Sequence, residues 1–424
     1  MKKKKLDLVN ETLYFEKLDN GLEVYMLPKK DYHTAYAGYA TYFGGDDTEL
    51  LVDGEIINQP GIAHFIEHAI FDTKLANNAS LFDFFKNQGI DYGATTYADW
   101  TWYRFSTNKS FKKRLTTMLS YIDNPDFTDS SIEKEKGVIQ EEIKRTQSNA
   151  YDEKVRVFYE CLFKGSKRGQ CILGKTHEIS RITKETLYEY YYTNYHPSNM
   201  CLILVGKFNP TELLKHIKDY QSTRDLTKYK LSTPLAEVIK REIGIKEKTI
   251  HLNIGTDEII LGFKLIKDDL SLKDHDLKIH LELLLRMMFS SSNKFVENLK
   301  ERKLLVGAVG YFLNIQGPYI ILIISACTKD TNTLKKELLK YIKNFKPCKD
   351  NFELLKKAKL ANSIKSFDSL DNLFFATRDM LARYKTIPVD SVKMVKDAEF
   401  SKLENLYKEL DFTNYTTLIC KPKE

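Results

Sequence analysis

The start of the chain alternates hydrophobic and polar residues with the two-residue period of β-strands. Residues 13–28 (LYFEKLDNGLEVYMLP) form two such runs on either side of an Asp-Asn-Gly turn, which predicts two strands joined at that turn. From His33, the segment HTAYAGYATYFGG alternates small and large residues, which indicates a strand buried on at least one face. Thr, Tyr and Trp are concentrated in residues 89–107, so strand structure is expected there as well.

Other segments have the spacing of amphipathic helices. The longest in the first half, 129–148, is highly charged and follows a proline-marked turn. The expected helices cover residues 61–71, 80–87, 111–123 and 129–148, and later residues 274–289, 331–344 and 352–384. Apolar segments within residues 196–208, 249–266 and 307–327 predict the strands that accompany these helices.

The order of strands, helix, further strands and long helices occurs twice along the chain. A chain of 424 residues is also too long for one ordinary core. We therefore expect an α+β protein of two structurally similar lobes, each a mostly antiparallel sheet with helices packed on it. The expected boundaries are residues 1–220 for the first lobe, 221–248 for a polar linker with an edge strand, and 249–424 for the second lobe.

Composition and charge exclude several classes of protein. The chain is 42% hydrophobic and 29% charged, and no run approaches the length of a membrane-spanning helix. The basic N-terminus lacks the apolar run of a signal peptide, and the six cysteines have no paired spacing, so free thiols and a cytoplasmic location are expected. The net charge of +7 comes from intermixed basic and acidic residues, so neither a nucleic-acid nor a membrane partner is expected.

Residues 61–72 (GIAHFIEHAIFD) carry the strongest chemical signal. On a helix, His64 and His68 lie on one face, because positions i and i+4 are neighbours there. Two such imidazoles can bind zinc, which in catalytic sites takes three protein ligands and a water. Glu67 is rotated by about 100° from His68, so it is better placed to take a proton from a metal-bound water than to bind the metal. The order H-x-x-E-H is the inverzincin pattern. The alternative is an amphipathic helix with two partly exposed histidines.

A third ligand is expected from another helix, and the segment EKEKGVIQEEI offers one. Glu135 and Glu142 are seven residues apart and share a helix face. Val138 and Ile139 lie between them and can pack that face inward. We therefore predict Glu142 at the metal and Glu135 beside it, although either glutamate alone would ordinarily be a solvated surface charge.

Together these segments resemble the insulinase, or pitrilysin, family of zinc peptidases. HFIEH is followed about seventy residues later by EKEKGVIQEEI, and DNGLEVYMLPK and YHPSNMCLILVGKF are similar to further family segments. The resemblance is strong over residues 15–210 and rests on topology beyond them. The chain length is similar to that of half-size bacterial members. The resemblance implies a pitrilysin-like fold and a zinc endopeptidase that cleaves extended peptides, such as leader peptides, presequences or short fragments.

The resemblance also implies a role for each matching residue. His64, His68 and Glu142 match the family's zinc ligands. Glu67 matches the catalytic base that activates water. Glu135 matches an acid that orients a histidine ligand.

The segment Gly93-Ala94-Thr95 matches the edge strand on which family members bind the substrate as an added β-strand. The family's asparagine is replaced by Gly93 in this chain. A side-chain contact to the substrate is therefore lost, whereas main-chain pairing by Ala94 is retained.

A second departure concerns an Arg and a Tyr, seven residues apart, that relatives or their partner subunits use to hold the substrate. Alignment on Leu299 places Lys300 and Gly307 at these two positions, although Arg302 and Tyr311 lie close enough to leave the register open. We therefore expect the zinc-bearing subunit of a heterodimer whose homologous partner supplies Arg and Tyr. A homodimer is the other arrangement considered.

A non-catalytic scaffold or binding subunit of a peptidase complex is the competing interpretation of the whole chain. Family members of that kind usually lose the H-x-x-E-H residues. All five metal-related and catalytic positions are present in this sequence, which favours the enzyme.

Overall fold

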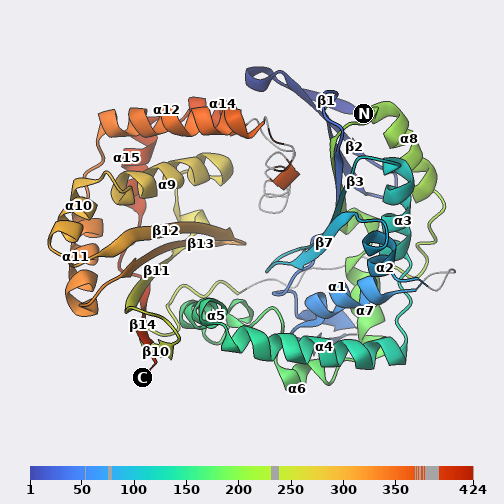
Figure 1. The fold of residues 1–424 in the computed structure, drawn as a ribbon, viewed down its shortest axis with the longest axis horizontal. Helices are drawn as coiled ribbons and strands as arrows, with labels where there is room; N and C mark the ends of the chain where they lie inside the picture. Colours follow the sequence, from blue (N-terminus) through green and yellow to red (C-terminus); the bar gives the residue numbers. More distant parts are fainter. Residues whose placement is uncertain are drawn as a thin grey trace. The chain divides into compact units, whose positions relative to one another are not determined.

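The computed structural model describes residues 1–52, 54–74, 79–230, 238–367 and 391–423, together with 369, 371, 374, 375 and 377 (Figure 1). The chain forms two compact units. The first comprises Met1–Arg145, Cys171–Glu237 and Ser366–Pro388, and the second comprises Thr146–Gln170, Val238–Lys365 and Val389–Glu424. Each unit combines separate segments, whereas the expected lobes are continuous, and the lobe boundaries 1–220, 221–248 and 249–424 stay a prediction.

The first unit is built on a seven-stranded sheet. In spatial order its strands are β1 (Lys2–Leu6), β2 (Glu11–Lys17), β3 (Glu23–Pro28), β9 (Met200–Gly206), β4 (Ala35–Thr41), β8 (Thr101–Thr107) and β7 (Asp91–Thr96). All neighbours are antiparallel except β3 and β9. The predicted turn between β2 and β3 requires Gly21, which has φ +92° and whose added Cβ would lie 2.6 Å from Ser198 Cβ.

Helices pack on one face of this sheet (Figure 1). They are α1 (Ile62–Asp72), α2 (Leu81–Lys86), α3 (Phe111–Asp123), α4 (Asp129–Ser148), α6 (Thr176–Ile179), α7 (Lys184–Asn194) and α8 (Pro210–Gln221). The shorter elements are the 3-10 turns η1 (Asp7–Val9) and η3 (Pro197–Asn199) and a separate hairpin of β5 (Glu49–Val52) and β6 (Glu55–Asn58). The apolar faces of α1, α3, α7 and α8 and of the central strands form one continuous core.

The second unit has a five-stranded sheet with helices on both faces. Its spatial order is β10 (Glu247–Leu252), β14 (Tyr415–Pro422), β11 (Glu258–Ile266), β13 (Tyr319–Cys327) and β12 (Val306–Gln316), with β10 and β14 the parallel pair. One face packs on α5 (Ala150–Phe163). The other face packs on helices from the set α9 (Asp274–Phe289), α10 (Lys294–Glu301), α11 (Thr331–Asn344), α12 (Lys349–Ser366), α14 (Ser391–Lys396) and α15 (Phe400–Glu409). Two 3-10 turns, η2 (Lys167–Gly169) and η4 (Lys267–Asp269), complete the unit.

The predicted α+β class with mostly antiparallel sheets and packed helices is confirmed. The expected helix over 352–384 begins at Lys349, and most of its part beyond Ser366 lies outside the described residues. The strands β1 and β14 and the β5–β6 hairpin were not predicted. Across the described part of the chain, no helix is both long enough and apolar enough to cross a bilayer.

Candidate metal centre

Helix α1 places two imidazoles at one point because His64 and His68 are four residues apart on one helix face. Almost all of the surface of this helix is buried. Its apolar side chains pack into the core of the first unit, and His64 itself is only 8% exposed. The helix is preceded by Gly61 at φ +83°, where an added Cβ would lie 2.7 Å from Ile179 Cδ1 and 2.8 Å from the Leu173 carbonyl oxygen. The rings of His64 and His68 are one turn apart, with centroids separated by 4.6 Å.

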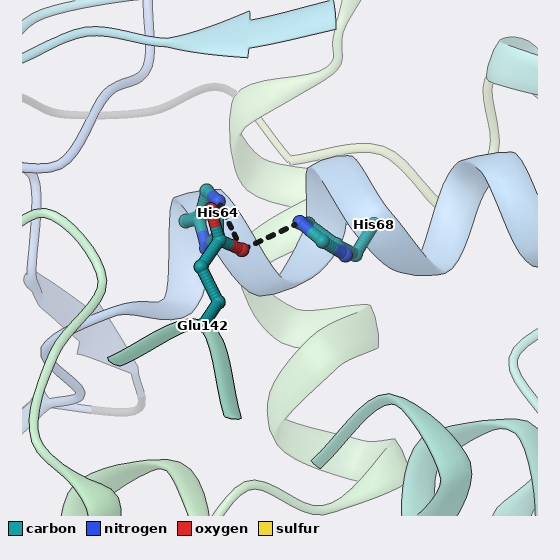
Figure 2. Close-up of side chains that lie close together, drawn as sticks. All are labelled: His64, His68 and Glu142. Carbon is teal, nitrogen blue, oxygen red and sulfur yellow. Dashed lines mark ion pairs between the residues drawn. The ribbon is translucent and has the colours of Figure 1, made fainter. Parts of the chain in front are cut away.

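Helix α4 supplies the third side chain of this group. Glu142 Oε2 lies 3.8 Å from His64 Nε2 and 3.5 Å from His68 Nε2. Figure 2 shows the carboxylate directed between the two imidazoles. Their possible ligand atoms all lie within 4.8 Å of one another. Among the described residues, no other set of three His, Cys, Asp or Glu side chains is grouped as closely.

The donor set fits zinc. Two imidazole nitrogens and one carboxylate oxygen are the ligands of many catalytic zinc sites, which leave the fourth position for water. Ligand atoms on a tetrahedral zinc are about 3.4 Å apart, close to the two nitrogen–oxygen separations between the imidazoles and Glu142.

Glu135 lies beside this group and fixes one of its rings. Its Oε2 is 3.2 Å from His68 Nδ1, so the other ring nitrogen, Nε2, is the one directed at Glu142. A neighbouring ion pair joins the two helices, because Lys134 Nζ on α4 lies 2.6 Å from Asp72 Oδ1 on α1. Glu135 therefore has the position that the sequence assigned to it, beside a histidine of the group.

The two histidines have opposite electrostatic environments. Burial and the neighbouring charge of His68 lower the pKa of His64 to about 3. Burial also lowers the pKa of His68, but hydrogen bonds with Glu135 and Glu142 outweigh it and raise that pKa to about 9. The pKa of Glu142 is lowered, chiefly by its hydrogen bond with His68. At neutral pH the metal-free group therefore holds one proton, on His68.

Glu67 is buried next to this group, with 9% of its surface exposed. Burial raises the pKa of its carboxyl group, and a hydrogen bond from Thr96 opposes that rise. Thr96 Oγ1 donates this bond to Glu67 Oε2 over 2.6 Å. The contact joins α1 to the end of β7 and was not found from the sequence, where Thr96 was only one of several threonines in a strand-forming segment.

A pocket of about 670 Å³ opens between α1, α4 and β7. Its lining includes Glu67, His68, Phe71, Asp72, Lys74, Ser80, Phe82, Asp83, Tyr92, Gly93, Ala94, Lys134, Glu135 and Val138. The predicted inward packing holds for Ile139, which is fully buried, but is wrong for Val138. Val138 is 44% exposed because it faces this pocket and not the core.

The segment 93–95 lies at the open edge of the first unit's sheet. In the described part of the chain, β7 is paired with β8 alone. Gly93 and Ala94 line the pocket, whereas Thr95 is exposed outside it. The predicted edge strand is thus next to Glu67 and His68.

Comparison with known proteins identifies one family of peptidases. Residues 55–173 match the family model described as insulinase, peptidase family M16, and residues 181–377 match the model described as peptidase M16 inactive domain. The chain is 29% identical to the uncharacterized zinc protease YmfH of Bacillus subtilis, over 97% of both chains. It is 28% identical to the mitochondrial-processing peptidase subunit beta of Bos taurus, over 47% of this chain and 42% of that protein.

A solved structure has the same fold over nearly all of the chain. A putative M16-like peptidase from Alicyclobacillus acidocaldarius superposes with a TM-score of 0.86 and 22% sequence identity, covering 97% of this chain and 99% of that one. The similarity in length matches the expectation of a half-size member.

Proposed function

We propose that this chain, which belongs to the insulinase family of peptidases (family M16), is a zinc-dependent endopeptidase that cleaves extended peptides. One observation carries the proposal: the Nε2 atoms of His64 and His68 and the carboxylate of Glu142 converge from two helices, with Glu67 buried beside them at a pocket. The two buried members, His64 and Glu67, are otherwise costly to bury.

The residues of this group would have three roles: metal binding, positioning of a ligand, and proton transfer. His64, His68 and Glu142 would hold the metal, and Glu135 is a positioning residue that keeps His68 in the tautomer with Nε2 facing inward. Zinc, when bound, lowers the pKa of a bound water toward about 7 and polarises the peptide carbonyl. Glu67 accepts the proton of the attacking water and returns it to the leaving amine, and the rise in its pKa caused by burial makes it a stronger base than an exposed carboxylate.

The edge strand β7 would bind the substrate. An extended peptide that adds to this edge forms main-chain hydrogen bonds along Gly93, Ala94 and Thr95 and crosses the mouth of the pocket. Such binding requires an unfolded segment, which leader peptides, presequences and degradation fragments provide. The pocket beside His68 is large enough for a side chain of any size.

We further propose that the active enzyme is a pair of subunits. The mitochondrial relative is named as a subunit, and this chain has Lys300 and Gly307 at the two positions where the family resemblance implies Arg and Tyr. The nearby Arg302 is already paired with Glu337 over 2.9 Å in the second unit. A homologous partner would supply the missing Arg and Tyr. We also propose a cytoplasmic location, because its reducing environment keeps cysteines free, as all six are in this chain.

The scaffold interpretation has one point in its favour, the family model described as an inactive domain. That match covers residues 181–377, whereas the candidate ligands lie between His64 and Glu142, in the other matched region. A scaffold would purify without stoichiometric zinc. The enzyme would purify with one zinc per chain.

The test is peptide cleavage by the purified chain, alone and with a homologous partner subunit. Glu67→Gln should keep its zinc and lose about 10²–10⁴-fold in kcat, because the proton acceptor is removed. Glu141→Gln is the matched control, because Glu141 is an exposed neighbour on α4 that pairs with Lys144. Unchanged cleavage by Glu67→Gln would show that the base is another group.

A further inference from the structure

Arg104 on β8 is the one charged side chain that reaches across Gly93 toward the open edge of the sheet, among the contacts described for that glycine. We propose that Arg104 selects substrates that carry aspartate or glutamate at the position facing Gly93. This inference rests on the proposed function, since it assumes that a peptide strand adds to β7.

The register of the sheet places the two residues on one face. Gly93 and Arg104 are direct partners in the antiparallel pair of β7 and β8, so their side-chain directions coincide. A Cβ built on Gly93 would lie 3.5 Å from Arg104 Nη2, 3.6 Å from Nε and 3.7 Å from Cζ. The guanidinium group therefore lies over the edge strand, in van der Waals contact with the place that a Cβ at position 93 would take.

From this place the guanidinium group can reach an added strand. Neighbouring strands are about 4.8 Å apart, and directly opposed Cβ atoms are about 4.5–5.5 Å apart. The Nη2 and Nε atoms already lie one strand inward from the substrate, so a carboxylate on the residue opposite Gly93 comes within hydrogen-bond distance of them. The Nε and Nη2 edge of the guanidinium group can bind a carboxylate in a bidentate manner.

Two contacts orient Arg104 without using that edge. Asp91 Oδ2 accepts a hydrogen bond from Nη1 over 2.7 Å, and the ring of Phe375 lies 6.0 Å from Cζ. The side chain of Asp91 is 59% exposed and that of Arg104 is 26% exposed. A guanidinium group has five N–H donors, so Nε and Nη2 can serve a substrate carboxylate while Nη1 stays on Asp91.

The expected preference is moderate, because the site is partly exposed to water. We expect kcat/KM to be roughly three- to tenfold higher for Glu than for Gln at the position facing Gly93. Asp91 competes for the same cation, so Asp91→Asn should increase the preference. Gly93→Ala inserts a methyl group at van der Waals distance from the guanidinium group and should reduce the preference without straining the backbone.

The experiment uses one neutral peptide substrate in which Glu, Gln or Lys is placed at each position in turn. The zinc-loaded enzyme, in the assembly that cleaves peptide, should prefer Glu at a single position relative to the cleaved bond. Arg104→Gln should abolish that preference, and Arg104→Glu should reverse it in favour of Lys. Lys113→Glu, an equal charge change at an exposed residue of α3, is the control and should leave the preference unchanged.

The same peptides are titrated against the inactive Glu67→Gln protein by fluorescence anisotropy, so that the preference is also measured as binding. Equal kcat/KM and equal Kd for the Glu and Gln peptides, or a preference that persists in Arg104→Gln, would overturn the role of Arg104. Absence of cleavage by the wild-type assembly, with the binding preference present, would instead overturn the peptidase function and leave Arg104 as a specificity residue of a binding protein.

Discussion

The proton on His68 gives the metal-free protein a pH-dependent stability that can be measured. Hydrogen bonds with Glu135 and Glu142 raise the pKa of His68 from its ordinary value of 6.5 to about 9, against the opposing effect of burial. Each unit of pKa shift corresponds to about 1.4 kcal/mol, so the shift corresponds to about 3 kcal/mol of unfolding free energy. The perturbation that isolates this contribution is His68→Asn in the presence of a zinc chelator.

The sign follows from which state holds the proton. Between pH 6.5 and 9 the folded protein binds the His68 proton and the unfolded chain does not, so the stabilisation falls as the pH rises through this window. It is fully present below about pH 6.5 and absent above about pH 9. The difference in unfolding free energy between wild type and His68→Asn should therefore shrink by about 3 kcal/mol across the window.

The assay is urea unfolding at pH 6, 7, 8 and 9, with the same chelator throughout. Val138→Ala is a suitable control, because it removes methyl groups from the same pocket without removing a proton site. Its difference from wild type should not depend on pH. A constant difference between wild type and His68→Asn from pH 6 to 9 would refute the electrostatic description of this group.

Three further predictions concern zinc binding, the positioning residue Glu135 and the buried ion pair of Arg224. Zinc binding at pH 7 should release about one proton, which calorimetry in buffers of different ionisation enthalpy measures, because the metal displaces the proton of His68; no dependence on buffer would contradict this. Glu135→Gln should weaken zinc binding by about 10–100-fold in a competition titration with a chromophoric chelator; wild-type affinity would remove Glu135 from the positioning role. In urea unfolding, Arg224→Ala should lower the unfolding free energy by about 3–5 kcal/mol, because the buried carboxylate of Asp123, 3.3 Å away, loses its cation. A loss below about 1 kcal/mol would show that the hydrogen bonds donated by Tyr39 and Tyr220 are enough to stabilise the Asp123 carboxylate.

The meeting of His64, His68 and Glu142 could be anticipated because the residues of each helix follow helical spacing. Four positions separate His64 from His68 and seven separate Glu135 from Glu142, and both helices formed where the apolar pattern indicated them. The direction of Glu142 could also be anticipated, since Ile139 fixes the buried face of α4. Val138 shows the limit of that reasoning, because an apolar residue at a pocket looks the same in sequence as one in the core.

Contacts between strands were not predictable in the same way. The hydrogen bond from Thr96 to Glu67 depends on how the end of β7 meets α1, and the position of Arg104 over Gly93 depends on the register of β7 and β8. Neither pairing follows from the period of one segment. The strand β14 was missed for a related reason, since a short apolar run near the C-terminus is recognisable as a strand only by its pairing with β10 and β11.

The central claim is that one zinc ion is held by three side chains from two helices. Metal analysis of the purified chain and two glutamine variants tests it most directly. The account predicts one zinc per chain in the wild type and in Glu141→Gln, and little or none in Glu142→Gln, whose carboxylate lies 3.5 Å and 3.8 Å from the two imidazoles. Full zinc occupancy in Glu142→Gln would contradict it.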